Sequence, residues 1–536
     1  MATSEPGKGR VRMRWSAATF AVALVLTACT GSGSHAQPSP PGPNTLTILA
    51  GSELSDLQPL VARIRKDTGL DLRFEYSGSL DGAETIVRGT DADLAWFSNE
   101  KYIDLAGGAA KVLDRQPIML SPVVVGVKQS LAKKFGWVGN DNVTWKMIAA
   151  KADDGEFRYA MTNPAASNTG FSALVGVASA YAGTGSALTS KEIDVKDLRA
   201  FFSGQALTAG SSGFLADAYV RHQDDLDGMI NYESVLLSLN QSGQLHEPLY
   251  LVYPRDGIVT ADYPLMLLNP AKRAQYEKLV NELRSPAIQT WLMTNTNRRP
   301  AVPGVPLDSR FPKRVLVELA FPSSLEVVRD LLSAYLNELA KPSHTLFVLD
   351  VSGSMFGTRI NALKKAMDGL AGVDNSVTGI FSQFRNREDV TIITFSSSVE
   401  GDRDFAVEGT DPNSPSLAAI REYVDGLSAG GNTAIYSALS KAYTQAVQSE
   451  TADPNRFTSI VLMTDGMNNS GESPQQFMAD LRGLGPAAAQ IPTYAVIFGE
   501  ASPAALTQIA DETGGKVFDS RSASLSEVFK EIRGYQ

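Results

Sequence analysis

The chain contains very little cysteine and histidine. Its 536 residues include one cysteine and four histidines. A single cysteine excludes a disulfide within the chain. The histidines are His35, His222, His246 and His344, and none lies near another in the sequence. The Cys/His spacing of a zinc site is therefore absent.

Positive charge is also in short supply. The chain has 48 Lys and Arg residues against 58 Asp and Glu residues, a net charge of −10, which argues against nucleic-acid binding. Neither a G-x-S-x-G elbow nor a G-x-x-x-x-G-K-[ST] loop occurs, so the two most recognisable hydrolase and nucleotide-binding signatures are missing. We expect a binding protein and not an enzyme. The length predicts two to four domains.

The N-terminus has the pattern of an export signal. Basic residues between positions 8 and 14 precede an apolar run at 17–26 that is too short to serve as a lone membrane span. The following Leu26-Thr27-Ala28-Cys29 resembles the lipobox of bacterial lipoproteins. This resemblance predicts a signal peptide at 1–28, lipidation of Cys29, and an anchor on the extracytoplasmic side of the cell membrane. The alternative is an ordinary secretory signal with an unrelated cysteine. Residues 29–44 are rich in Ser, Gly and Pro and predict a tether.

Alternating apolar segments begin at residue 45. Segments 45–50, 70–79 and 91–99 have the pattern of strands, with a helix expected over 57–69. This order predicts βαβ units in an α/β fold with a parallel sheet. Ligands of such sheets bind beyond the carboxyl ends of the strands. The candidate solute-binding residues at those ends are Ser52, Ser79, Ser98 and Asn99.

Two later segments resemble extracellular solute-binding proteins of the two-lobed, periplasmic type II kind. They are the Thr162–Gly170 turn, TNPAASNTG, and the YPRDG…DYP stretch that begins at Tyr253. The resemblance covers about 45–320 and implies a small solute in a cleft. It adds four candidate ligand residues, Ser167, Asn168, Thr169 and Tyr253. A helix start at 167–170 offers free N–H groups to an anion. The alternative is a generic α/β domain whose serines cap helices.

A domain boundary is expected near residue 341. An amphipathic helical pattern at 323–340 ends at Lys341-Pro342. We therefore predict a two-lobed domain at 45–340 and a second domain at 341–536. In the second domain, strands are expected at 344–350, 389–395, 456–466, 491–499 and 516–519. Their apolar character on both faces predicts a doubly wound, Rossmann-like α/β domain.

Five oxygen-bearing residues follow strands of this second domain or lie in its loops. They are Asp350, Ser352, Ser354, Thr433 and Asp465. Neighbouring strand ends meet at one edge of a doubly wound sheet, so these side chains should converge. Their order resembles the metal-ion-dependent adhesion site (MIDAS) of von Willebrand factor A (VWA) domains. The alternative is that the aspartates cap helices and the serines fill turns.

The chemistry of this set suits a hard cation. Mg²⁺ prefers about six oxygen ligands, and Mn²⁺ or Ca²⁺ are alternatives. The resemblance implies that Ser352, Ser354 and Thr433 are direct ligands and that Asp350 and Asp465 act partly through water. It also implies an open position for a carboxylate of a partner protein.

Two functions follow from this domain organisation. In the first, a membrane-anchored protein binds a partner through the metal, and the solute-binding-like domain serves as sensor or spacer. In the second, the chain is the solute receptor of an ABC-type transporter with an accessory VWA domain. The sequence identifies neither the solute nor the partner.

Overall fold

The computed structural model describes residues 42–313, 315–521 and 524–536. The predicted signal peptide, Cys29 and most of the predicted tether lie outside these ranges. Within them, no helix is both long enough and apolar enough to cross a membrane.

The first lobe is built on a five-stranded sheet in the order β2-β1-β3-β11-β4. β1, β2 and β3 are parallel, whereas β11 and β4 run antiparallel to their neighbours. The predicted parallel pairing of the first three strands is correct. β11 runs antiparallel to β3 and β4 because it belongs to the segment that returns to this sheet after the second lobe. The strands are β1 (Thr45–Gly51), β2 (Asp71–Ser77), β3 (Leu94–Trp96), β4 (Asp114–Pro117) and β11 (Pro264–Leu267). The helices are α1 (Gln58–Thr68), α2 (Ser79–Arg88), α3 (Lys101–Ile103), α10 (Arg273–Leu283) and α11 (Pro286–Thr296).

The second lobe has a seven-stranded sheet. Its main path is β10-β5-β8-β6-β7, and β9 and β12 also pair with β5. The strands are β5 (Met119–Lys128), β6 (Tyr159–Thr162), β7 (Gln205–Ala209), β8 (Gly228–Tyr232), β9 (Leu249–Val252), β10 (Thr260–Ala261) and β12 (Arg299–Pro300). The helices are α4 (Gln129–Lys134), α5 (Trp145–Asp153), α6 (Asn168–Ala182), α7 (Val195–Phe202), α8 (Ser212–His222) and α9 (Glu233–Ser242).

Two buried tryptophans tie the return segment to both lobes. The Trp96 indole N–H donates to the Tyr263 carbonyl at 2.9 Å, and the Trp145 indole N–H donates to the Gly257 carbonyl at 2.8 Å. A buried indole N–H needs such a partner. The stretch around 257–263 therefore joins the two lobes, and helix α12 (Leu325–Ala334) packs against their core.

The third sheet has the order β15-β14-β13-β16-β17-β18. All pairings are parallel except that of the edge strand β15. The strands are β13 (Ser343–Asp350), β14 (Glu388–Phe395), β15 (Val399–Val407), β16 (Phe457–Thr464), β17 (Thr493–Ile497) and β18 (Lys516–Asp519). The helices are α13 (Thr358–Asp368), α14 (Val377–Ser382), α15 (Pro415–Asp425), α16 (Ile435–Ala452), α17 (Pro474–Gly483), α18 (Pro486–Ala489), α19 (Pro503–Glu512) and α20 (Leu525–Arg533).

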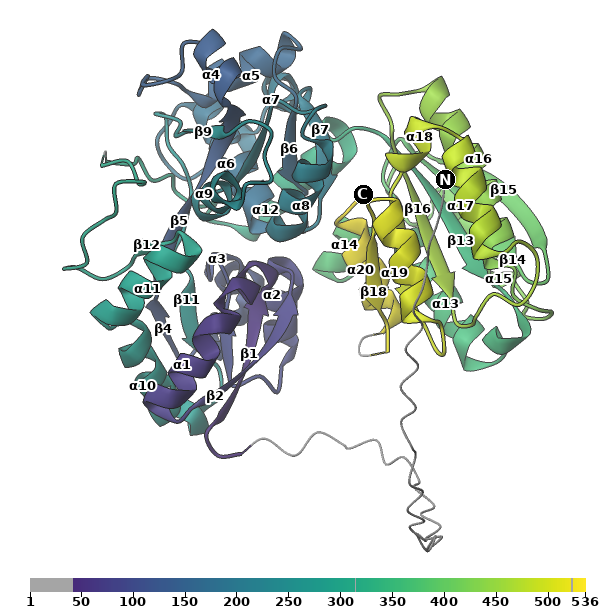
Figure 1. The fold of residues 1–536 in the computed structure, drawn as a ribbon, viewed down its shortest axis with the longest axis horizontal. Helices are drawn as coiled ribbons and strands as arrows, with labels where there is room; N and C mark the ends of the chain where they lie inside the picture. Colours follow the sequence, from purple (N-terminus) through teal and green to yellow (C-terminus); the bar gives the residue numbers. More distant parts are fainter. Residues whose placement is uncertain (1–41, 314, 522–523) are drawn as a thin grey trace, which may run out of the picture. The chain divides into compact units, whose positions relative to one another are not determined.

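Helices cover both faces of this third sheet (Figure 1). Along β13, Phe347 and Leu349 pack in one core with residues of α13 and α20, and Leu346 and Val348 pack in another with residues of α16 and α17. Alternate side chains of a strand point to opposite faces, so a strand buried on both sides is apolar throughout. The doubly wound α/β fold is therefore as predicted.

Candidate metal centre and solute cleft

The predicted metal residues gather at the carboxyl edge of the third sheet. Asp350 ends β13 and Asp465 directly follows β16, and these two strands pair in parallel. The turn after β13 carries Ser352 and Ser354, whose hydroxyl oxygens are 3.0 Å apart. The Ser354 hydroxyl donates to Asp465 Oδ1 at 2.6 Å. Residues 111 positions apart in sequence thus form one hydrogen-bonded cluster.

The Asp350 carboxylate is fully buried in this cluster. It accepts the Ser352 backbone N–H at 2.8 Å and the Thr464 hydroxyl at 2.6 Å. Burial raises the pKa of the Asp350 carboxyl above its usual range, and these hydrogen bonds oppose that rise. Asp350 therefore fixes the turn that holds the serines.

Thr433 is brought to the cluster by a loop held on two sides. Its backbone N–H donates to the Asn469 side-chain oxygen at 2.7 Å, and its carbonyl accepts the Asn469 N–H at 2.9 Å. Gly431 has φ +80°, which favours glycine, and its carbonyl accepts the Gly353 N–H at 3.0 Å. A Cβ built on Gly466 would lie 3.6 Å from both the Thr433 and Ser354 hydroxyl oxygens, so the two hydroxyls face the same small space.

Arg359 is part of this site, and sequence reasoning missed it. Its Nη1 donates to Asp465 Oδ2 at 2.6 Å, whereas Ser354 donates to the other carboxylate oxygen, Oδ1. Arg359 lies at the start of α13, five positions after Ser354. No sequence pattern marked it, because an arginine early in a helix is normally solvent-facing.

The donor set of this cluster fits a hard divalent cation. Every polar side-chain atom contributed by the five predicted residues is an oxygen, as Mg²⁺ prefers. Within the described ranges, no group of three or more His, Cys, Asp or Glu side chains is placed to hold a metal. A metal held here would therefore depend on hydroxyl oxygens as well as on carboxylates.

The predicted cleft residues of the two lobes also meet one another. The Asn99 amide of the first lobe donates to the Asn168 side-chain oxygen of the second lobe at 2.6 Å. The Asn168 amide in turn donates to the Tyr232 hydroxyl at 3.1 Å. Ser98 is fully buried beside them. These amides join the two lobes, and Asn99 and Asn168 line a small space of about 10 Å³.

Thr169 lies inside a cluster of hydroxyls. Its buried Oγ1 is 2.8 Å from the Thr162 hydroxyl oxygen and 2.9 Å from those of Ser167 and Ser212. A solute would have to replace one of these bonds to reach Thr169.

Tyr253 serves a buried ion pair. Its hydroxyl donates to Glu233, which is fully buried and accepts Arg299 Nε at 2.6 Å and Nη2 at 2.7 Å. Of the remaining predicted residues, Ser52 lines the cavity described next, whereas Ser79 lines the small space of about 10 Å³ described above.

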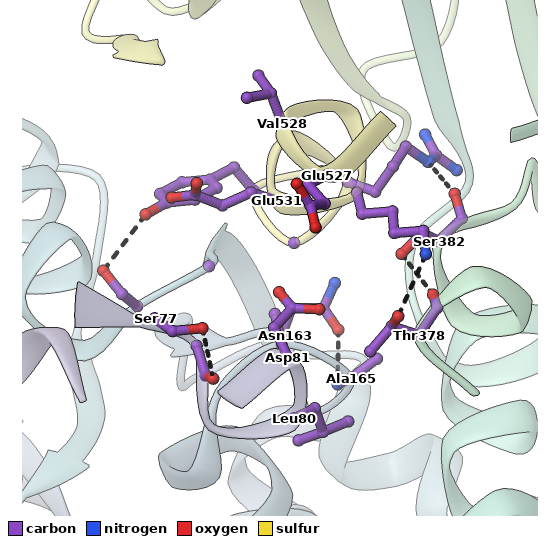
Figure 2. A pocket seen from close by; sticks show the side chains of 18 of the residues that line it. Ser77, Leu80, Asp81, Asn163, Ala165, Thr378, Ser382, Glu527, Val528 and Glu531 are labelled. Atoms are coloured by element: carbon purple, nitrogen blue, oxygen red, sulfur yellow. Dashed lines mark hydrogen bonds between the residues drawn. The ribbon is translucent and has the colours of Figure 1, made fainter. Parts of the chain in front are cut away.

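A cavity of about 450 Å³ lies between the two lobes and the third-sheet domain. Figure 2 shows Ser77, Asp81 and Asn163 of the lobes opposite Thr378 and Glu531 of the third-sheet domain. Of the eight predicted ligand residues, only Ser52 lines this cavity. Sequence reasoning also missed its third wall, since no local signal connects α14 or α20 to the lobes.

Comparison with known families agrees with this domain organisation. Residues 46–295 match the model of the bacterial extracellular solute-binding protein, and residues 346–531 match the von Willebrand factor type A domain. The predicted combination of a solute-binding-protein-like domain with a C-terminal VWA domain is confirmed.

Curated relatives cover only part of this chain. Inter-alpha-trypsin inhibitor heavy chain H3 from Homo sapiens is 29% identical over 162 residues, and the Mesocricetus auratus protein is 32% identical over 146 residues. These matches span 30% and 26% of this chain, and the chain spans only 16% and 15% of the relatives' own lengths.

Solved structures that this chain matches include a periplasmic binding protein and a von Willebrand factor type A protein. The periplasmic binding protein P5PA has a TM-score of 0.44 at 15% identity, covering 55% of this chain and 99% of that one. A von Willebrand factor type A protein from Catenulispora acidiphila has a TM-score of 0.29 at 23% identity, covering 36% of this chain and 42% of that one.

Proposed function

We propose that this chain is an extracytoplasmic binding protein whose VWA domain binds a partner protein through a divalent cation, Mg²⁺ in the first instance. The observation that carries the proposal is the oxygen cluster at the carboxyl edge of the VWA sheet, where the Ser354 hydroxyl lies within hydrogen-bonding distance of both the Ser352 hydroxyl and the Asp465 carboxylate. Hydroxyl ligands leave most of the cation's charge uncompensated, which favours a carboxylate from a partner as a further ligand. The function is binding and not catalysis.

The surroundings of the cluster suit a protein partner. Phe356, two positions after Ser354, is 81% exposed, and Met467, two positions after Asp465, is 69% exposed. Large apolar side chains exposed beside a polar site are typical of protein interfaces. The partner would present an acidic side chain to the metal and apolar side chains to this rim.

The rest of the chain would anchor the VWA domain to the membrane and carry a solute-binding-like domain. We place the lipid anchor at Cys29 after a signal peptide at 1–28, followed by a tether at 29–44, a solute-binding-like domain at 45–340 and the VWA domain at 341–536. The alternative function is reception of a solute for an ABC-type transporter. A permease and an ATPase encoded beside this gene would favour that alternative.

The metal site is tested by calorimetry with Mn²⁺ on the full chain and by partner capture with and without EDTA. Thr433→Ala removes a hydroxyl ligand, and loss of a supporting group alone costs about ten- to a hundredfold in metal affinity. We expect at least that loss, together with loss of EDTA-sensitive capture.

Thr451→Ala is the matched control. It removes an exposed hydroxyl whose bond goes only to the Val447 carbonyl of its own helix. Equal Mn²⁺ affinity in the wild type, Thr433→Ala and Thr451→Ala would refute the metal site.

A further inference from the structure

The last residues of the VWA domain reach into the second lobe. The Tyr535 ring packs edge-on against Phe214 of α8, with ring centroids 5.0 Å apart. Its hydroxyl lies 3.4 Å from the Ser211 hydroxyl oxygen, and its ring covers Gly210. A Cβ at Gly210 would lie 2.5 Å from a ring carbon. Glycine at this position therefore allows the aromatic ring to approach the backbone.

Tyr535 is held firmly from the VWA side. Its carbonyl accepts the Tyr494 hydroxyl at 2.9 Å. Arg385 donates to the carbonyls of Arg533 at 2.8 Å and Gln536 at 2.9 Å, and all three residues are buried. The segment after α20 cannot swing away alone, so Tyr535 leaves the lobe only when the VWA domain moves as a body.

The VWA domain also contacts the first lobe. The Glu84 carboxylate of α2 accepts the Thr378 backbone N–H at 2.6 Å and the Thr378 hydroxyl at 2.7 Å, and both residues are buried. Hydrogen bonds to a buried carboxylate are among the stronger ones in proteins. The VWA domain therefore contacts each lobe through a separate anchor.

These two anchors lie on either side of the solute cleft. The cavity between them is lined by Ser52, Ser77 and Asn163 of the lobes and by Lys530 and Glu531 of α20. The cationic groups of the VWA wall are already paired: Lys530 with Asp374, and Lys516 with Glu531 at 3.0 Å. The wall thus closes the cavity without offering it a free positive charge.

We infer that the solute cleft is an intramolecular docking site for the VWA domain. In the docked state, α20 and Tyr535 lie across the mouth of the cleft, and Thr378 of the VWA domain contacts the first lobe. A domain anchored to both lobes fixes the distance between them. Lobe closure on a solute and VWA docking are then mutually exclusive, because closure requires one anchor to break. The cleft is therefore occupied by the chain's own third domain before a solute can bind.

The test measures access to the cleft in the full chain. In a Cys29→Ser background, Ser77→Cys provides the only thiol, and a polymer-linked maleimide is too large for the 450 Å³ cavity. Gly210→Val is designed to displace Tyr535. We expect labelling of the Ser77→Cys thiol at least about tenfold faster with Gly210→Val, since about 1.4 kcal/mol of lost docking corresponds to tenfold.

Two controls separate undocking from misfolding. Gly213→Val adds the same side chain three residues later, where a Cβ meets nothing within 4 Å, and should leave labelling slow. Glu84→Gln weakens the first-lobe anchor without adding bulk, and should also speed labelling.

Hydrogen exchange supplies the readout of the fold. In Gly210→Val, the β5 and β8 amides should stay protected, and so should those of 530–536, which move with the VWA domain. Fast labelling in the unmodified chain would overturn the docking, as would equally slow labelling in Gly210→Val and Glu84→Gln. Loss of β5 and β8 protection in Gly210→Val would mean that this variant misfolds. The labelling rate of Glu84→Gln would then test the docking by itself.

Discussion

Asp81 should make the docked chain less stable as pH rises. Its carboxyl faces the cavity between the lobes and the VWA domain. Burial, together with the nearby carboxylates of Glu84 and Glu531, raises its pKa from 3.8 to about 6, against the opposing effect of Lys530 and Arg88. The charged form is therefore disfavoured in the folded protein.

The sign and size follow from linkage. The folded state binds the Asp81 proton more tightly than the unfolded state, so stability is greatest below the ordinary pKa and falls as pH rises towards about 6. A shift of about two units corresponds to about 3 kcal/mol at most. Asp81 is only half-buried, so solvent screening reduces this figure.

Asp81→Asn removes the ionisation and keeps the side-chain size. Compared with the wild type, the variant should melt at the same temperature near pH 4 and several degrees higher above about pH 7. Asp91→Asn, an exposed carboxylate of the same lobe, should give no such pH-dependent difference. A melting-temperature difference that is flat between these pH values would refute the reasoning. Combining Asp81→Asn with Gly210→Val should shrink the effect, because Glu531 acts only in the docked state.

Two further predictions concern the anchor and the metal site. Cys29→Ser should move the protein from the membrane fraction to the soluble fraction, and unchanged fractionation would contradict the anchor. Arg359→Gln should raise Mn²⁺ affinity about tenfold in calorimetry, because it removes a cation that is hydrogen-bonded to a carboxylate of the metal cluster. Lys365→Gln removes an exposed charge on the same helix and should change the Mn²⁺ affinity little. An equal change in Mn²⁺ affinity in both variants would show that only the net charge matters.

The strands that the sequence predicted were those with apolar runs. β13 and β16 are buried on both faces, so their composition alone marks them. β15 was missed because its VEGDRDFAV sequence is largely polar. An antiparallel edge strand with one exposed face needs few apolar residues, and its pairing with β14 is decided by the fold.

The site could be predicted as far as strand ends determine it. Asp350 and Asp465 follow strands that pair, so their approach follows from topology. The Thr464 hydroxyl on Asp350 and the Arg359 guanidinium on Asp465 depend on side-chain packing between distant segments. Docking was beyond prediction for the same reason, since the amphipathic pattern of α20 identifies the face it buries and not what its other face meets.

Partner binding and docking use opposite ends of the VWA sheet. The metal cluster lies at the carboxyl ends of β13 and β16. The end of α20 and the residues after it contact the amino ends instead: Arg533 pairs with Glu388, the first residue of β14, and Gln536 donates to Ser459 near the start of β16. An eight-residue strand spans roughly 25 Å. A partner can therefore reach the metal while the cleft is occupied, and Gly210→Val should leave Mn²⁺ affinity unchanged. A change in that affinity would mean that the sheet transmits docking from one end to the other.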